Sequence, residues 1–265
     1  MSLSMNRLAT LGAVGVVVVP SVWYGLKSII NRMYQKTEVT PVEYFTKFGI
    51  VVKYPSSINI QDVKKFKPFN DWFERADCDG SIVYESIEIL NAYMFGKKVG
   101  FLFMNVTGYY VEGEVKKQIP GAVFLRGNSC AVLVWYRKND EKYVVLINQF
   151  RMAANSCIWE VPAGMMDDDN NAKGKMFDEL YEETGIDVNN SKNEMVQVPT
   201  VYSSPGILDE QYHLFSIEIE EEELKSMTIG NKNDDEIITS VASFNIKSCP
   251  TDDVKLLALL NCIEN

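Results

Sequence analysis

The spacing of hydrophobic and polar residues changes along the chain, and each pattern predicts a different kind of element. Helical spacing of apolar residues predicts helices at residues 171–184 and 251–264. Residues 37–70 show no clear pattern, so we expect an irregular linker there. Runs rich in β-branched and aromatic residues, bounded by turn residues, predict strands at residues 81–90, 98–115, 121–137, 142–152, 210–219 and 234–246.

The order of these elements, many strands with few helices, predicts an α/β fold built on a mixed β-sheet. The chain has 265 residues, enough for one large domain with a smaller appendage. We expect a targeting or membrane-anchor segment at residues 1–36, a linker with a small β-rich subdomain at residues 37–120, and the main domain at residues 121–265.

The stretch from Leu8 to Leu26 contains 19 residues without a charge. As a helix it would reach about 28 Å, close to the roughly 30 Å of a bilayer core. More basic residues follow the run than precede it, which favours a membrane anchor with the next domain on the cytosolic side. A cleaved secretory or organelle-targeting segment is one alternative, and a helix buried within a cytosolic protein is the other.

Composition and charge exclude some function classes. The formal net charge is −10 and the pI is about 4.8, whereas binding to a phosphate backbone depends on lysine and arginine, so we expect no nucleic-acid partner. The five cysteines stand singly, as free thiols of a reducing compartment do. The chain has one histidine, which excludes catalysis by a histidine pair.

The helix predicted at residues 171–184 concentrates negative charge. Glu179, Glu182 and Glu183 share one face, because residues three and four apart are neighbours on a helix. Like charges at this spacing cost roughly 0.2–0.5 kcal/mol per pair. A hard divalent cation with oxygen ligands would offset the repulsion, so the pattern indicates a Mg²⁺ site, with Mn²⁺ as an alternative. The other interpretation is a purely structural acidic helix.

The segment from Val161 to Ile186 resembles the signature of the Nudix hydrolases. Asn170 stands where the family has Glu, and Asp178 stands where it has Arg. Residues 147–169 and 202–215 are similar to the flanks of nucleotide-sugar pyrophosphatases of this family, and residues 69–75, 94–106 and 118–136 are similar to its plant-type ADP-sugar pyrophosphatase branch. Seven of the nine defined signature positions agree, namely Gly164, Glu179, Leu180, Glu182, Glu183, Gly185 and Ile186.

The resemblance implies a Nudix fold, in which a mixed β-sheet is sandwiched between helices. It also implies Mg²⁺-dependent hydrolysis of a nucleotide sugar, such as ADP-ribose or ADP-glucose, to a nucleoside monophosphate and a sugar phosphate. The metal ligands that it implies are the backbone carbonyl of Ala163 and the carboxylates of Glu179, Glu182 and Glu183, with Glu182 in either a ligand or a nearby catalytic role. A homodimer is expected from the same resemblance.

Further site residues are expected outside the signature. Glu210 is the expected general base, with Asp209 as the alternative, and a simple turn is the structural interpretation of both. Arg151, Arg126 and Glu160 are expected to contact the substrate, since a guanidinium suits phosphate oxygens; each also has a structural interpretation. Because Asn170 and Asp178 depart from the signature, a catalytically weak domain that binds a nucleotide as a sensor is the alternative function.

Overall fold

The structure, a computed structural model, describes residues 42–45, 49–75, 80–166, 171–189, 191–228 and 237–263. The chain divides into two compact units, Met1–Pro41 and Val42–Asn265. The expected anchor at residues 8–26 therefore lies outside the described residues. Within the described ranges, every helix is too short or too polar to cross a bilayer.

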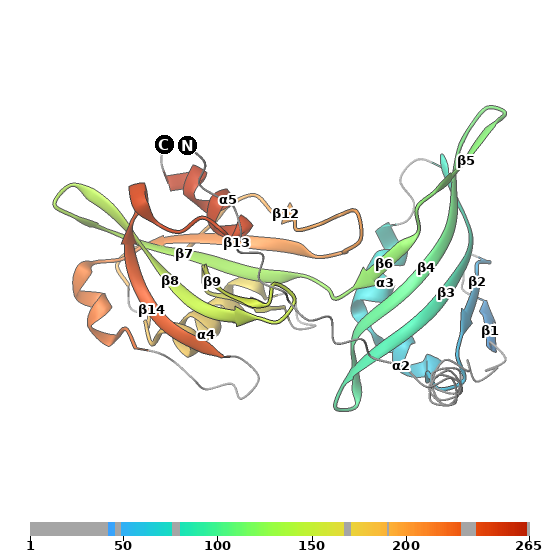
Figure 1. Cartoon of the computed structure of the whole chain (residues 1–265), viewed down its shortest axis with the longest axis horizontal. Helices are drawn as coiled ribbons and strands as arrows, with labels where there is room; N and C mark the ends of the chain where they lie inside the picture. Colours follow the sequence, from blue (N-terminus) through green and yellow to red (C-terminus); the bar gives the residue numbers. More distant parts are fainter. Residues whose placement is uncertain are drawn as a thin grey trace, which may run out of the picture. The chain divides into compact units, whose positions relative to one another are not determined.

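A six-stranded sheet forms the first half of the described chain (Figure 1). Its strands follow the order β1-β2-β3-β4-β5, and β6 pairs with β4. Two helices, α2 (Ile60–Lys65) and α3 (Lys67–Arg75), contribute to one core with this sheet, in which Val63 and Phe73 pack with Leu102. The strands are β1 (Val42–Phe45), β2 (Val51–Tyr54), β3 (Ile82–Phe95), β4 (Lys98–Glu112), β5 (Val115–Ile119) and β6 (Ala122–Leu125).

The irregular linker expected at residues 37–70 is wrong where the structure describes it. The segment contributes β1, β2, α2 and the start of α3. Two signals in the sequence account for the helices. The side chain of Asn59 caps α2 by accepting a hydrogen bond from the backbone N–H of Gln61. Apolar residues at positions 63, 66, 69 and 73 then follow at helical spacing and contact the core.

An eight-stranded sheet forms the second half, with the order β11-β13-β7-β8-β14. β7 and β13 run parallel, whereas β8 is antiparallel to both β7 and β14, so the sheet is mixed as expected. β10 pairs with β7, β9 with β8 and β12 with β13. The strands are β7 (Ser129–Lys138), β8 (Glu141–Arg151), β9 (Ser156–Glu160), β10 (Ala163–Met165), β11 (Val196–Gln197), β12 (Val201–Tyr202), β13 (Gln211–Glu218) and β14 (Ile238–Asn245).

The single strand expected at residues 121–137 is two strands, β6 and β7, in different sheets. The break falls at residues 126–128, where Gly127 adopts a positive φ of 83° that an L side chain rarely takes. The other expected strands are confirmed, and the turn after β7 has Asn139 and Asp140 at positive φ, as a tight hairpin requires.

Two helices cover opposite faces of the eight-stranded sheet. α4 (Ala172–Thr184) packs on the face of β7 that carries Cys130 and Val132, and α5 (Val254–Ile263) packs on the face that carries Ala131 and Leu133. The alternation along β7 follows from the two-residue period of a strand, and its near-continuous burial is typical of a strand covered on both sides. This arrangement confirms an α/β fold with a mixed sheet between helices. The expected homodimer stays a prediction.

Candidate functional site

Helix α4 has the boundaries that its sequence predicts. The side chain of Asn171 accepts a hydrogen bond from the backbone N–H of Gly174 at the start, and Gly185 ends the helix in the left-handed conformation with φ 71°. Between these caps, Glu179 and Glu183 lie one turn apart and are 6% and 3% exposed. Two acidic side chains are therefore buried on a helix that otherwise packs apolar residues.

Strand β10 lies directly against these two carboxylates. The backbone N–H of Ala163 donates to Glu183 Oε2 at 3.1 Å. A Cβ on Gly164 would lie 2.2 Å from Glu179 Oε1, so a larger residue here would require the Glu179 side chain to move. Three of the four expected metal-ligand residues, Ala163, Glu179 and Glu183, therefore come together, and the fourth, Glu182, is half-buried on the same helix.

The donor set fits a hard cation, because carboxylate oxygens and a backbone carbonyl are the ligands that Mg²⁺ prefers. Within the part of the chain that the structure describes, however, no three acidic, histidine or cysteine side chains gather closely enough to surround an ion. Each carboxylate has a separate donor: Lys175 Nζ lies 2.9 Å from Glu179 Oε1, and Glu183 accepts from Ala163. The aspartates at positions 167–169 lie outside the described residues. The ligand set stays a prediction.

At one end of β10, Glu210 is 2% exposed and accepts a hydrogen bond from Ser129 Oγ at 2.9 Å. Ser129 pairs with Met165, the residue that follows the signature glycine Gly164. The hydrogen bond from Ser129 therefore holds Glu210 near this end of β10. Arg126 Nη1 lies 3.4 Å from Glu210 Oε1. Glu210 is thus a buried, paired carboxylate near the signature segment, and its catalytic role stays a prediction.

Asp209 has a different environment from its neighbour. One of its oxygens accepts from the backbone N–H of Arg126 at 2.8 Å and of Gly127 at 3.2 Å, and Arg75 lies 4.0 Å from the other oxygen. Burial raises the pKa of Asp209 above its ordinary value even though these donors lower it. The contacts give Asp209 a structural role in fixing the residues that link β6 to β7. Sequence reasoning had no signal for the contribution of Arg75.

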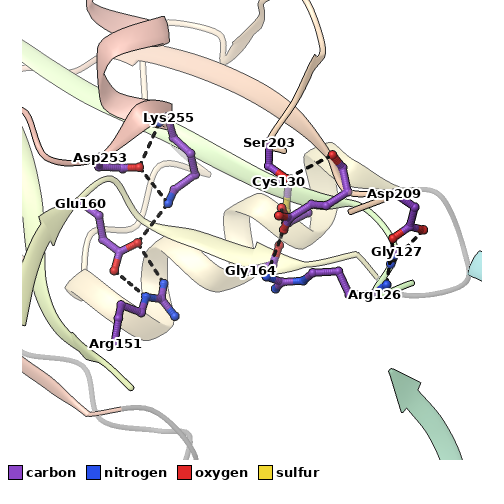
Figure 2. A network of polar contacts seen from close by, with 12 residues as sticks. Arg126, Gly127, Cys130, Arg151, Glu160, Gly164, Ser203, Asp209, Asp253 and Lys255 are labelled. Atoms are coloured by element: carbon purple, nitrogen blue, oxygen red, sulfur yellow. Dashed lines mark hydrogen bonds and ion pairs between the residues drawn. The ribbon is translucent and has the colours of Figure 1, made fainter. Parts of the chain in front are cut away.

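Near the start of β10, Arg151 and Glu160 form a bidentate ion pair, with 2.7 Å from Nε to Oε1 and 3.0 Å from Nη2 to Oε2. Lys255 Nζ also donates to Glu160 Oε2, at 3.0 Å, and lies 3.0 Å from Asp253. In Figure 2, Gly164 lies between this group and the group formed by Arg126 and Asp209. The structure thus brings Arg151 and Glu160 together and adds Lys255 and Asp253, which the sequence pattern did not indicate.

The charges of this group keep one another ionised. Burial raises the pKa of Glu160, but the hydrogen bond from Arg151 and the charges of Lys255 and Arg151 outweigh it, so the pKa lies below its ordinary value. Burial lowers the pKa of Lys255, but the carboxylates of Asp253 and Glu160 raise it above its ordinary value.

A cavity of ≈ 700 Å³ lies at the other end of β10, where it is lined by Met165 and Met166, which follow the signature glycine. Its lining has five cations and two carboxylates, a net charge of +3, in a chain whose formal net charge is −10. Arg126 is one of the cations, and its guanidinium also lies over the ring of Phe101, 5.8 Å from the centroid. The cations are Lys65, Lys67, Lys97, Lys98 and Arg126, and the carboxylates are Asp62 and Asp71.

Cys130 lies beneath the signature glycine, and its Sγ is 3.6 Å from the carbonyl oxygen of Gly164. Burial, reinforced by the charge of Glu179, raises the pKa of this thiol to about 11. The thiol is therefore neutral near pH 7, and a neutral thiol is a poor nucleophile.

Known proteins resemble about half of this chain or somewhat more. No protein-family model matches the chain. The chain is 31% identical over 176 residues to Nudix hydrolase 14, chloroplastic, of Arabidopsis thaliana. This match covers 60% of the chain and 56% of the Arabidopsis protein. The chain is 36% identical over 129 residues to GDP-mannose pyrophosphatase of Cronobacter sakazakii, covering 46% of the chain and 63% of that protein. It therefore spans less than two thirds of these two relatives.

The match to GDP-mannose pyrophosphatase of Salmonella typhimurium is 31% identical over 153 residues and covers 54% of the chain and 76% of that protein. With the signature at Gly164 and on α4, and the mixed sheet between helices, this likeness shows that the chain belongs to the Nudix hydrolase family. The match to the Arabidopsis protein confirms the resemblance to the plant-type branch of the family.

The buried charges predict a specific pH dependence of stability. Because the pKa of Glu160 is lowered on folding, its carboxylate adds stability above the unfolded pKa of about 4.3, and that stability is lost as the pH falls through the folded value. Glu160→Gln should lower the free energy of unfolding at pH 7 by about 3–5 kcal/mol, since it removes the carboxylate that pairs with both Arg151 and the buried Lys255. Urea unfolding from pH 7 down to pH 3 should show the difference from wild type shrinking. A difference that stays constant would contradict the assignment.

Proposed function

We propose that the chain hydrolyses the pyrophosphate bond of a nucleotide sugar and releases a nucleoside monophosphate and a sugar phosphate. The observation that carries the proposal is the pair of buried carboxylates, Glu179 and Glu183, held one turn apart against β10. Burying two carboxylates side by side is unfavourable unless cations or donors compensate them. The net positive cavity beside β10 supports an anionic substrate at the same place.

The residues that would hold Mg²⁺, or Mn²⁺ in its place, are Glu179 and Glu183, the carbonyl of Ala163, and Glu182 as a ligand or as an adjacent group. When bound, the ion supplies positive charge that stabilises the charge developing on the phosphoryl oxygens. In this proposal the side chain of Lys175 moves away from Glu179 when the metal ion binds. The aliphatic chain of Lys175 is flexible, and the metal ion replaces the ammonium group as the positive charge beside the carboxylate.

Glu210 accepts the proton of the attacking water in this proposal. It lies near β10 through its hydrogen bond with Ser129, which favours it over Asp209, whose carboxylate is occupied by two backbone N–H groups. Arg151 and Arg126 bind phosphate oxygens, and Glu160 contributes by orienting Arg151. The partial exposure of both arginine side chains, 38% and 32%, supports a contact with a ligand.

The nucleotide sugar occupies the cavity that Arg126 lines. Its cations suit the diphosphate, and the apolar side chains of Phe66, Phe95 and Met165 offer surface to a base or a sugar ring. Candidate substrates are ADP-ribose, ADP-glucose and UDP-glucose, together with GDP-mannose, which appears in the names of two of the relatives.

A catalytically weak domain that binds a nucleotide as a sensor is the second candidate. It is favoured by Asp178, which adds a negative charge on α4 where the family signature has an arginine. Asp178 lies four residues before Glu182, so the two carboxylates repel each other where an arginine would attract Glu182 and help to hold it in place.

We further propose that residues 1–36 target the chain to an organelle, with a membrane anchor at residues 8–26 as the alternative. The uncharged run between basic flanks supports a targeting segment, and the Arabidopsis relative is named chloroplastic.

Incubation of the full chain with the four nucleotide sugars and Mg²⁺ should release nucleoside monophosphate from at least one of them. Glu179→Gln should lower kcat on the order of a hundredfold, because the group acts where charge develops in the transition state. Glu221→Gln, which removes an exposed carboxylate elsewhere, is the matched control and should leave the rate unchanged. Binding without release of monophosphate by the wild type would favour the sensor.

Mg²⁺ should raise the melting temperature of the full chain, since a ligand that binds only the folded state adds about 2.7 kcal/mol at a hundred times its Kd. Glu183→Gln should remove most of that rise while keeping an acceptor for the N–H of Ala163. Asp178→Asn removes one charge from the same helix outside the proposed ligand set and should keep the rise. An equal rise in melting temperature in wild type and Glu183→Gln would exclude Glu183 as a metal ligand.

Fractionation of cells that express the full chain tests the N-terminal segment. We expect the chain in an organelle fraction, and a variant that lacks residues 2–36 in the cytosolic fraction. Full-length chain that stays in the membrane pellet after carbonate treatment would indicate the anchor. An equal cytosolic distribution of both variants would contradict a targeting role.

A further inference from the structure

Four charged residues of alternating sign are joined in one row: Arg151, Glu160, Lys255 and Asp253 (Figure 2). Three of the four members are buried, with Glu160 3%, Asp253 6% and Lys255 8% exposed. An isolated buried charge costs several kcal/mol, so each member depends on the next one for its charge to be tolerated. Arg151 is the member with the exposed side chain, and it is the end of the row that can meet a ligand.

The far end of the row is fixed by the start of helix α5. Asp253 stands directly before the helix, its carbonyl accepts from the backbone N–H of Leu257, and its carboxylate accepts from the backbone N–H of Lys255 at 3.0 Å. The other carboxylate oxygen accepts from the backbone N–H of Val161 at 3.2 Å. Asp253 is thus an N-cap that also ties α5 to the residue between Glu160 and Pro162.

Glu160 transmits this fixed position to Arg151. It binds Nε and Nη2 of the guanidinium, which is one edge of the planar fork, so the plane is set and Nη1 is directed away from Glu160. Lys255 binds the same carboxylate and offsets part of its charge. The guanidinium consequently retains more of its positive charge toward an anion than it would in an isolated pair with Glu160.

We propose that Lys255 and Asp253 are positioning residues for Arg151, and that helix α5 sets the affinity for the phosphate-bearing ligand through Glu160. The inference rests on the proposed function, in which Arg151 binds a phosphate oxygen. Neither Lys255 nor Asp253 touches the ligand. Their effect is therefore exerted on binding, and it exists only while Arg151 is present.

A double-mutant cycle tests this dependence. The dissociation constants of ADP-ribose, ADP-glucose, UDP-glucose and GDP-mannose are measured by titration calorimetry on the full chain. The variant Lys255→Met/Asp253→Asn removes one positive and one negative charge and leaves the pair of Arg151 and Glu160 intact, which avoids an uncompensated buried charge. It should weaken binding of the preferred compound on the order of tenfold. Arg151→Met should weaken binding by at least as much.

In the Arg151→Met background, the Lys255→Met/Asp253→Asn pair should have no further effect, because residues that act through one group are not additive. A purely structural role would instead lower affinity by the same factor in both backgrounds, and that result would overturn the proposal. Where turnover is measurable, KM should rise with kcat nearly unchanged, since a contact made equally in the ground state and the transition state affects binding alone. Lys247→Met, which breaks an exposed ion pair with Glu141, is the control and should change neither constant.

The outcomes separate this proposal from the hydrolytic function. Binding without turnover would refute hydrolysis and leave the cycle fully measurable. Turnover by the wild type, together with additive effects of the variants on the dissociation constant, would refute the positioning role and leave hydrolysis intact. Failure of the wild type to bind any of the four compounds would overturn both.

Discussion

The contact between strand β10 and the carboxylates of Glu179 and Glu183 is the constraint on which the rest of the site depends. Two carboxyl groups are buried on one turn of α4, and such burial is tolerated only when each has a donor or cation within reach. The absence of a side chain at Gly164 lets the backbone approach Glu179, and the N–H of Ala163 satisfies Glu183. A change that separates β10 from α4 would remove the hydrogen bond from the N–H of Ala163 to Glu183.

Pairing of β10 with β7 extends that constraint to both ends of the site. Met165 pairs with Ser129, whose hydroxyl holds Glu210, and Gly164 pairs with Cys130. Two residues before Ala163, the backbone N–H of Val161 reaches Asp253 at the start of α5. One short strand therefore connects the acidic helix, the loop before β13 and the C-terminal helix, which explains why residues from distant parts of the chain share one region.

The sequence predicted those features that depend on residues close together in the chain. Helix α4, its cap at Gly185 and the alternation of β7 follow from periodicity and capping residues, and the sequence of α4 indicated that its acids share one face, but not that two of them are buried. The first strands and helices were missed because short elements with one cap, such as α2, give a weak signal. Lys255 was missed for another reason: its partner Glu160 is 95 residues away, and on its own helix it is a lone cation among leucines. No pattern within a helix reports such a partner.

The separation between these partners has a consequence for synthesis of the chain. β7 pairs in parallel with β13, and Glu160 meets Lys255 only after the final helix has formed. Contacts of such long sequence separation form late, because closing the intervening loop costs entropy before any contact compensates it. On a ribosome, α5 emerges after β7, β8, β9 and β13, so Glu160 lacks its contact with Lys255 until α5 has emerged. The charged row can therefore assemble only in a nascent chain that already includes α5.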